Sequence, residues 1–145
     1  MGNVLSQKEI ILDASQQRIW SLLGRVIIDS LELEKFKARD DRNFKAVMLV
    51  KMLFVTVPMQ IKGEMVNITP PETMDVLLDV EGFGGTIKLK QTIQFRLTQM
   101  DNEKTKLVCS VLLNNIGFMI VFKPIMKIVA NRILNNIEKL LIRFA

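Results

Sequence analysis

Three carboxylates with a spacing that could serve proton transfer lie on one strand-like segment. Asp75, Asp79 and Glu81 occupy odd-numbered positions, a spacing that could bring carboxylates together for general acid–base catalysis. The even-numbered positions from 74 to 80 are all apolar. Because side chains alternate across a strand, the three carboxylates would share the solvent side. We therefore expect a solvated acidic face here rather than a catalytic pair.

Other groups that serve catalysis are missing or isolated. The chain contains neither His nor Tyr, which removes the usual general base near neutral pH and the Ser–His and Cys–His nucleophile pairs. Its one cysteine, Cys109, falls on the apolar side of a strand, so we expect a small core residue and not a reactive thiol. A zinc site would need this thiol together with scattered carboxylates. Neither a metal nor another cofactor is expected.

Two amides and a glycine-rich segment are further candidates for ligand contacts. Strand alternation turns Gln91 and Asn67 inward, where either amide could orient a ligand carbonyl or satisfy the backbone near a bulge. The segment Gly82-Phe83-Gly84-Gly85 is similar to a phosphate-binding loop, but neither Lys-Ser/Thr nor a helix follows it. We interpret this segment as a tight turn or bulge between two strands.

The composition limits the class of protein. The 145 residues are 49% hydrophobic and 24% charged, which predicts one folded domain over residues 1–145. No apolar run reaches the roughly 18 residues of a membrane-spanning helix, and the first residues lack the build of a signal peptide. A cytoplasmic location is therefore expected. The net charge of +5 favours anionic surfaces without choosing among membranes, nucleic acids and acidic partners.

Hydrophobic periodicity predicts the elements that would position these residues. Apolar and polar residues alternate in seven segments, and apolar residues follow a helical period in two regions. Ser15 is a predicted N-cap, Gly24 ends the first helix, and residues 25–31 add one more short helical turn. The predicted strands are 3–12, 33–39, 44–51, 55–68, 74–81, 87–97 and 107–114, and the main predicted helices are 16–23 and 121–144.

The last helix is the element that can cover such a sheet. Short turns between successive strands imply antiparallel pairing, and each strand has one apolar face that needs a cover. At about 1.5 Å per residue, a helix over 121–144 is about 36 Å long, enough to cross the sheet. The expected fold is α+β, with a strongly curved antiparallel sheet of about seven strands wrapped around a long C-terminal helix, and two short helices after the first strand. The helix has an apolar stripe (Phe122, Met126, Val129, Ile133, Ile137, Leu140, Phe144) and a cationic face (Lys123, Lys127, Arg132, Lys139, Arg143).

Short motifs occur in the same order as these elements. They are Ala14–Trp20, Ile61–Val66 before Thr69-Pro70-Pro71, Glu81–Gly85, Thr105–Leu107 and Asn115–Gly117. In this order they resemble the helix-grip fold of the START-like superfamily, also called SRPBCC or Bet v 1-like. Within it they are most similar to the CoxG family of proteins associated with carbon monoxide dehydrogenase. The sequence departs from that family at a hairpin tip, where Lys51–Phe54 stands in place of a Gly-Pro turn.

The resemblance implies an apolar ligand cavity between the sheet and the last helix. Several methionines fall on inward positions, and their unbranched side chains could adapt the wall to varied apolar shapes. An ordinary core in which methionine fills gaps is the alternative. The candidate ligand-binding residues are Trp20, Met48, Val57, Met59, Ile61, Met65, Leu78, Phe83, Leu89, Gln91, Ile93, Val111, Phe122, Met126, Val129 and Ile133.

The resemblance also implies a function. The expected protein is a non-enzymatic carrier of a lipid-, isoprenoid- or quinone-like ligand, accessory to a CO-dehydrogenase-type molybdenum hydroxylase in maturation or membrane attachment. The implied partners are the ligand, the dehydrogenase subunits and the periphery of the inner membrane face. The alternatives are a polyketide cyclase-like enzyme, which would need an ionisable side chain in the cavity, and an interaction module that uses the basic helix face. Nucleic acid is not expected, because the outer sheet face lacks an aromatic platform.

The apolar hairpin tip at residues 52–54 has two interpretations. Lys51 is the only charge between Val47 and Met59. The tip could be buried against the helix or a neighbouring chain. Alternatively, it could be exposed at the mouth of the cavity and touch a membrane or a partner.

Overall fold

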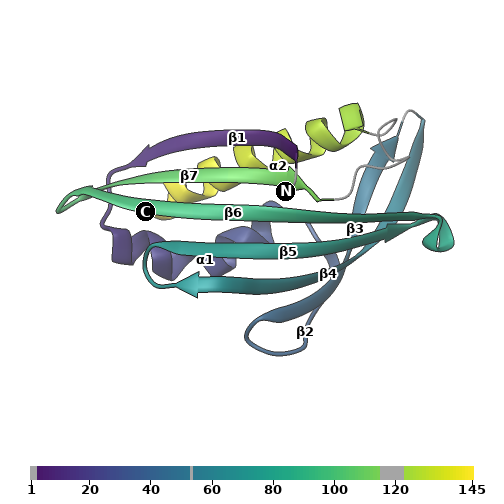
Figure 1. Cartoon of the computed structure of the whole chain (residues 1–145), viewed down its shortest axis with the longest axis horizontal. Helices are drawn as coiled ribbons and strands as arrows, with labels where there is room; N and C mark the ends of the chain where they lie inside the picture. The colour runs from purple at the N-terminus through teal and green to yellow at the C-terminus, as the bar shows by residue number, and fades with distance from the viewer. Residues whose placement is uncertain (1–2, 53, 115–122) are drawn as a thin grey trace.

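A computed structural model describes residues 3–52, 54–114 and 123–145 of the chain (Figure 1). The first part contains the strand β1 (Asn3–Leu12) and the helix α1 (Gln16–Ser30). Six further strands follow, and the long helix α2 (Lys123–Phe144) comes last. The remaining elements are β2 (Glu34–Ala38), β3 (Asn43–Met52), β4 (Val55–Thr69), β5 (Thr73–Gly82), the short 3-10 turn η1 (Phe83–Gly85), β6 (Ile87–Asp101) and β7 (Lys104–Leu113).

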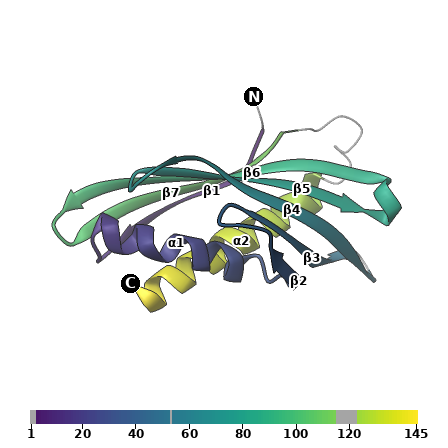
Figure 2. The same cartoon turned by 90° about the horizontal axis from the view of Figure 1, so that it is seen from below.

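The seven strands form one antiparallel sheet in the order β1-β7-β6-β5-β4-β3-β2. Strands β2 to β7 follow one another as hairpin neighbours, and β1 is added as an edge strand by pairing with β7. Figure 2 shows the curved sheet arching over both helices, which lie on the same face. This arrangement confirms the predicted α+β helix-grip fold. The face that carries the helices is called the inner face below, and the opposite one the outer face.

The first helix is one continuous element, so the prediction of two short helices separated at Gly24 is wrong. Ser15 caps it as predicted, because its hydroxyl accepts the backbone N–H of Arg18 at 3.2 Å. An interior glycine costs a helix only about 1 kcal/mol, and the apolar face that α1 buries continues past this residue and outweighs the cost. The buried apolar residues of α1 are Ile19, Leu23, Val26 and Ile27.

Cross-strand register places the apolar residues of neighbouring strands in rows on the inner face. One such row joins Leu78 of β5, Gln91 of β6 and Leu113 of β7, and all three side chains are buried. The alternation that predicted the strands therefore also identifies the face that is buried. The rows combine with α1 and α2 into a single apolar core.

Polar contacts fasten α2 to the edge strand β1. The Lys8 ammonium lies 2.7 Å from a carboxylate oxygen of Glu138 and donates a hydrogen bond of 2.8 Å to Asn135 Oδ1. The Ser6 hydroxyl donates to Asn131 Oδ1 one turn earlier. Asn131, Asn135 and Glu138 are spaced by four and three residues, so they lie on one side of α2. They form a polar stripe that faces β1.

A second set of contacts fastens α2 to the end of α1. The Asn136 amide donates to the Ser30 carbonyl at 3.1 Å and to Glu32 Oε1 at 3.0 Å, and Arg132 pairs with Glu32. The guanidinium of Arg25 lies 5.3 Å from the centre of the Phe144 ring. The second half of α2 is therefore held from two sides.

The first turns of α2 are held differently. Among the described residues, Asn131 is the first residue of α2 whose side chain makes a hydrogen bond or ion pair with the rest of the protein. Before it, Met126 and Val129 pack half-buried against the core. Within the described residues, the side chains of these first turns therefore contribute apolar contacts to the attachment of the helix and no polar ones.

Candidate functional site

The predicted ligand-binding residues gather on the inner face and on the helices that cover it. Phe122 lies outside the described residues, as does the side chain of Phe83. Ten of the others are buried: Met48, Val57, Met59, Ile61, Leu78, Leu89, Gln91, Ile93, Val111 and Ile133. The remaining four, Trp20, Met65, Met126 and Val129, are half-buried against the same core.

Packing is not equally tight across the inner face. Side chains in the middle of β6 and β7 are fully covered, and Ile93 and Val111 are both 0% exposed. Toward β3 and the far end of β5, Met48 and Val50 each keep 9% of their surface exposed and Val80 keeps 8%. The least tightly covered part of the inner face therefore lies at the β3–β5 side, where two of the predicted methionines, Met48 and Met59, are found.

Met59 occupies a space that a glycine provides. A Cβ atom built on Gly82, at the end of β5, would lie 2.2 Å from the Met59 sulfur. The thioether therefore packs directly on the Gly82 backbone. A methionine can leave such a position by rotating about its three side-chain bonds, whereas a branched residue could not. A ligand could therefore displace the Met59 side chain from the Gly82 backbone.

Phe44, at the start of β3, packs on a glycine in the same way. A Cβ atom on Gly63 would lie 2.2 Å from two atoms of the Phe44 ring, so the ring lies on the Gly63 backbone. The ring of Phe36 stands 5.5 Å away, centre to centre. Strand alternation alone does not predict this contact, although a mid-strand glycine opposite an aromatic residue on the neighbouring strand is its signal.

The inner face carries few polar groups among the described residues. Gln91 is buried there, as predicted from strand alternation. Burial raises the pKa of the Cys109 thiol, because the thiolate would lose its hydration, and the thiol is fully covered. Lys8 lies in the same cross-strand row as Cys109, at the sheet edge, where Glu138 neutralises it. This set can donate or accept hydrogen bonds, but it offers no free acid or base.

Asp75 corrects the expectation of a solvated acidic face. Its side chain is 5% exposed, and its carboxylate accepts hydrogen bonds from Arg96 at 2.7 Å and from Asn67 at 3.0 Å. Asp79 and Glu81 are exposed, as expected. Asp75 lies on the outer face, but neighbouring side chains cover it and provide its counter-charge. Its environment is that of a structural ion pair.

Asn67 also differs from its prediction. Strand alternation placed it inward, but its amide donates to Asp75 and the residue is exposed. The register of β4 with β5 shifts between Val66 and Thr69, and Asn67 has a φ of 51°. A bulge with one left-handed residue interrupts the alternation, which explains the error.

Two turns lie at the end of the sheet farthest from the chain's C-terminus (Figure 1). At the β3–β4 hairpin, Phe54 is fully exposed and Val55 is 60% exposed, while Leu53 and the Met52 side chain lie outside the described residues. The β5–β6 connection is the predicted tight turn, with Gly84 at φ 65° and Gly85 at φ 93°. Apolar side chains therefore project from the end where the first turns of α2 also lie.

The described helices contain no segment long and apolar enough to span a membrane.

Comparisons with known proteins show the fold alone. No family model matches the sequence, and no curated protein matches it. A START superfamily protein from Mycobacterium smegmatis is 12% identical with a TM-score of 0.60, and the alignment covers 97% of this chain and 98% of that one. The Zhui aromatase/cyclase from Streptomyces sp. R1128 is 11% identical with a TM-score of 0.61, covering 95% and 90%.

An enzyme from a plant is similar as well. A norcoclaurine synthase from Thalictrum flavum is 15% identical with a TM-score of 0.66, and the alignment covers 99% of this chain and 96% of that one. The solved structures that share this architecture thus include enzymes as well as a protein named only by its superfamily. The chain therefore has the helix-grip fold of the START-like, or Bet v 1-like, proteins.

Proposed function

We propose that the protein is a non-enzymatic carrier for a small apolar ligand of lipid, isoprenoid or quinone type, bound between the sheet and α2. The observation that carries this proposal is the unequal attachment of α2. Its second half is held by hydrogen bonds and ion pairs to β1 and to the end of α1, whereas Met126 and Val129 in its first turns have apolar contacts alone. That end can separate from the sheet without breaking a polar side-chain contact between described residues.

The ligand would enter at the β3–β5 side, where the inner face is least tightly covered by other side chains. Met48 and Met59 lie on the β3–β4 side of that face, and both side chains can rearrange around an apolar guest. Burying about 300 Å² of ligand surface is worth several kcal/mol at about 25 cal/mol per Å², before the cost of association is subtracted. The buried amide of Gln91 would orient a polar end of the ligand.

A cyclase-like or condensing enzyme is the second candidate, because two enzymes share this fold. Such chemistry needs a proton donor or acceptor beside the ligand. Among the described residues the inner face offers Lys8, already paired with Glu138, and a thiol that burial keeps protonated. This set of side chains therefore favours the carrier over the enzyme.

The sequence resemblance to the CoxG family suggests where such a carrier would act. We propose an accessory role beside a CO-dehydrogenase-type molybdenum hydroxylase, with the dehydrogenase subunits as partners and the ligand delivered at a membrane surface. The exposed Phe54 and Val55, next to Lys51, would enter the headgroup layer peripherally. Nucleic acid is not among the proposed partners.

Extraction of the purified protein with organic solvent, followed by mass spectrometry, tests the carrier. We expect a stoichiometric apolar compound, or, in its absence, saturable uptake of the neutral probe N-phenyl-1-naphthylamine. The variant Met59→Trp should reduce uptake, and Met100→Trp is its matched control because Met100 is 56% exposed. A protein that carries nothing and takes up no neutral probe would contradict the proposal.

A further inference from the structure

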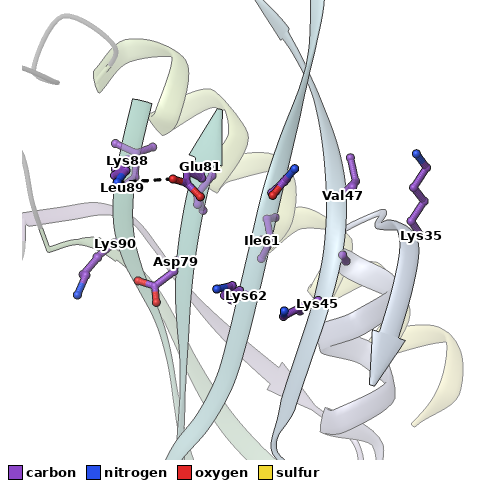
Figure 3. Close-up of a pocket in the computed structure, with 13 residues that line it drawn as sticks. Lys35, Lys45, Val47, Ile61, Lys62, Asp79, Glu81, Lys88, Leu89 and Lys90 are labelled. Carbon is purple, nitrogen blue, oxygen red and sulfur yellow. Dashed lines mark ion pairs between the residues drawn. The ribbon is translucent and has the colours of Figure 1, made fainter. Parts of the chain in front are cut away.

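The outer face of the sheet contains a hollow that the carrier function does not use. It has a volume of about 580 Å³ and lies over β2 to β6, on the side of the sheet away from both helices (Figure 3). Five lysines line it: Lys35, Lys45, Lys62, Lys88 and Lys90. Two carboxylates, Asp79 and Glu81, line it as well. Its walls therefore carry a net charge of +3, while its floor is formed by the sheet itself.

The strand register forces several of these lysines together. Lys37 pairs with Lys45 across β2 and β3, and Lys45 pairs with Lys62 across β3 and β4. Like charges directly opposite each other destabilise a sheet. Three consecutive strands thus present the same charge in one row, and shielding by solvent lowers the repulsion without removing it. A surface that served solvation alone would be more stable with alternating charges.

The carboxylates of the hollow neutralise only part of this row. Asp79 continues the row on β5, between Lys62 and Lys90. One carboxylate therefore stands between two ammonium-bearing positions of the row. Glu81 lies 3.7 Å from the ammonium of Lys88 and forms its ion pair, drawn as a dashed line in Figure 3. Within the described part of the chain, Lys45, Lys62 and Lys90 make no ion pair at 4.0 Å or less.

The shape and chemistry of the hollow limit what can bind. Its volume falls in the range of about 300–1,000 Å³ that small-molecule sites occupy. No aromatic side chain lines it among the described residues, so it cannot stack nucleic-acid bases. Lysine ammonium groups bind phosphate oxygens as point charges, and Gln60 adds an amide that can donate. These features favour a compact ligand with several negative charges.

We propose that this hollow binds a small soluble ligand that carries two or more phosphate groups. Lys45 and Lys62 would hold one phosphate between them, and Lys90 would hold a second across Asp79. Binding would relieve the repulsion within the lysine row, so the unpaired charges become favourable when the ligand is present. The site is independent of the apolar one, because the sheet separates the two.

Isothermal titration calorimetry with inorganic tripolyphosphate tests this site. We expect saturable binding with one ligand per chain, weakened at least tenfold by the double variant Lys45→Gln/Lys62→Gln. The variant Lys127→Gln/Lys139→Gln changes the net charge equally on exposed positions of α2 and should leave the affinity within twofold of the original. Equal losses in both variants would overturn the proposal, because the binding would then follow net charge. Failure of the original protein to bind would overturn it too.

Further measurements separate the site from misfolding and from a membrane surface. Lys62→Gln should raise the melting temperature of the unliganded protein, and Asp79→Asn should tighten tripolyphosphate binding several-fold. Vesicles of phosphatidylcholine with 20% phosphatidylserine provide the lipid arm, and the Lys45→Gln/Lys62→Gln variant should bind them like the original protein. A loss of vesicle binding without tripolyphosphate binding would assign the lysines to lipid headgroups instead. Uptake of the neutral probe should be unchanged in every variant.

Discussion

The ammonium of Lys8 lies 2.7 Å from the carboxylate of Glu138 and so joins the first strand to the last helix, across 130 positions of the chain. Each side chain is about one-third exposed, at 31% and 32%. A pair that is about two-thirds covered and has a second acceptor, Asn135, keeps its geometry better than a free surface pair. This contact holds α2 at its second half and leaves the first turns to apolar packing, which is the asymmetry on which the carrier proposal depends.

Breaking this pair should loosen α2. In a double-mutant cycle with Lys8→Met and Glu138→Gln, we expect a coupling of about 1 kcal/mol in the free energy of unfolding, measured by urea denaturation. The pair of Lys88 and Glu81 is the control, because its charges are 3.7 Å apart and more exposed, and its coupling should fall near zero. Equal couplings for the two pairs would show that the contact does not fasten the helix.

Two glycines should respond oppositely to the same substitution. Gly63→Ala would place a methyl group in the Phe44 ring and should lower the free energy of unfolding by about 1–3 kcal/mol. Gly24→Ala meets nothing within 4 Å and should raise it by up to about 1 kcal/mol, because alanine favours the helix. Thermal unfolding measures both. If Phe44→Leu fails to restore stability to Gly63→Ala, the ring is not the group that the methyl displaces.

The Cys109 thiol should resist modification in the folded protein. Burial raises its pKa above the ordinary 9.0, so the folded state holds the proton more tightly than the unfolded state. Stability from this group is therefore complete below about pH 9 and declines as the pH rises above that value. Ellman's reagent at pH 8 should label the protein only after denaturation, and rapid labelling of the folded protein would contradict the burial.

The exposed tip of the β3–β4 hairpin should mediate membrane contact. Phe54 is fully exposed, so Phe54→Ser should leave the melting temperature unchanged while it weakens sedimentation with anionic vesicles several-fold. Ile142→Ser is the matched control, because Ile142 is 63% exposed near the other end of α2. Equal effects of the two variants would argue against an oriented contact through the tip.

Strand alternation predicted most of the fold because most strands bury one apolar face; β2 is the exception, since all five of its residues are exposed. The same rule failed at Asn67, where a bulge with a positive φ breaks the period, and at Asp75, whose burial depends on the side chains of Arg96 and Asn67. Gly24 did not end its helix, because the apolar face continued beyond it. Local signals cannot reveal which distant side chains cover a residue.

For the candidate site, the sequence pattern predicts which residues lie on the inner face but not which residues of different strands or helices meet. Residues such as Met48 and Met59 were assigned to the inner face from alternation, and the structure places them there. The register that opposes Lys45 to Lys62 depends on the length of the β3–β4 hairpin, and it was not apparent from either strand alone. The pairing of Lys8 with Glu138 forms only when β1 and α2 pack together in the folded protein, so no pattern within one segment indicates it.

Methyl NMR of protein labelled at the methionine methyl groups tests the central claim most directly. Titration with a neutral ligand such as a short-chain quinone should shift the resonances of Met48 and Met59 on the inner face and of Met126 in the first turns of α2. Met100 is exposed and should keep its resonance. We expect saturable shifts confined to the first three. Shifts at Met100 alone, or none at saturating ligand, would contradict a binding site between the sheet and α2.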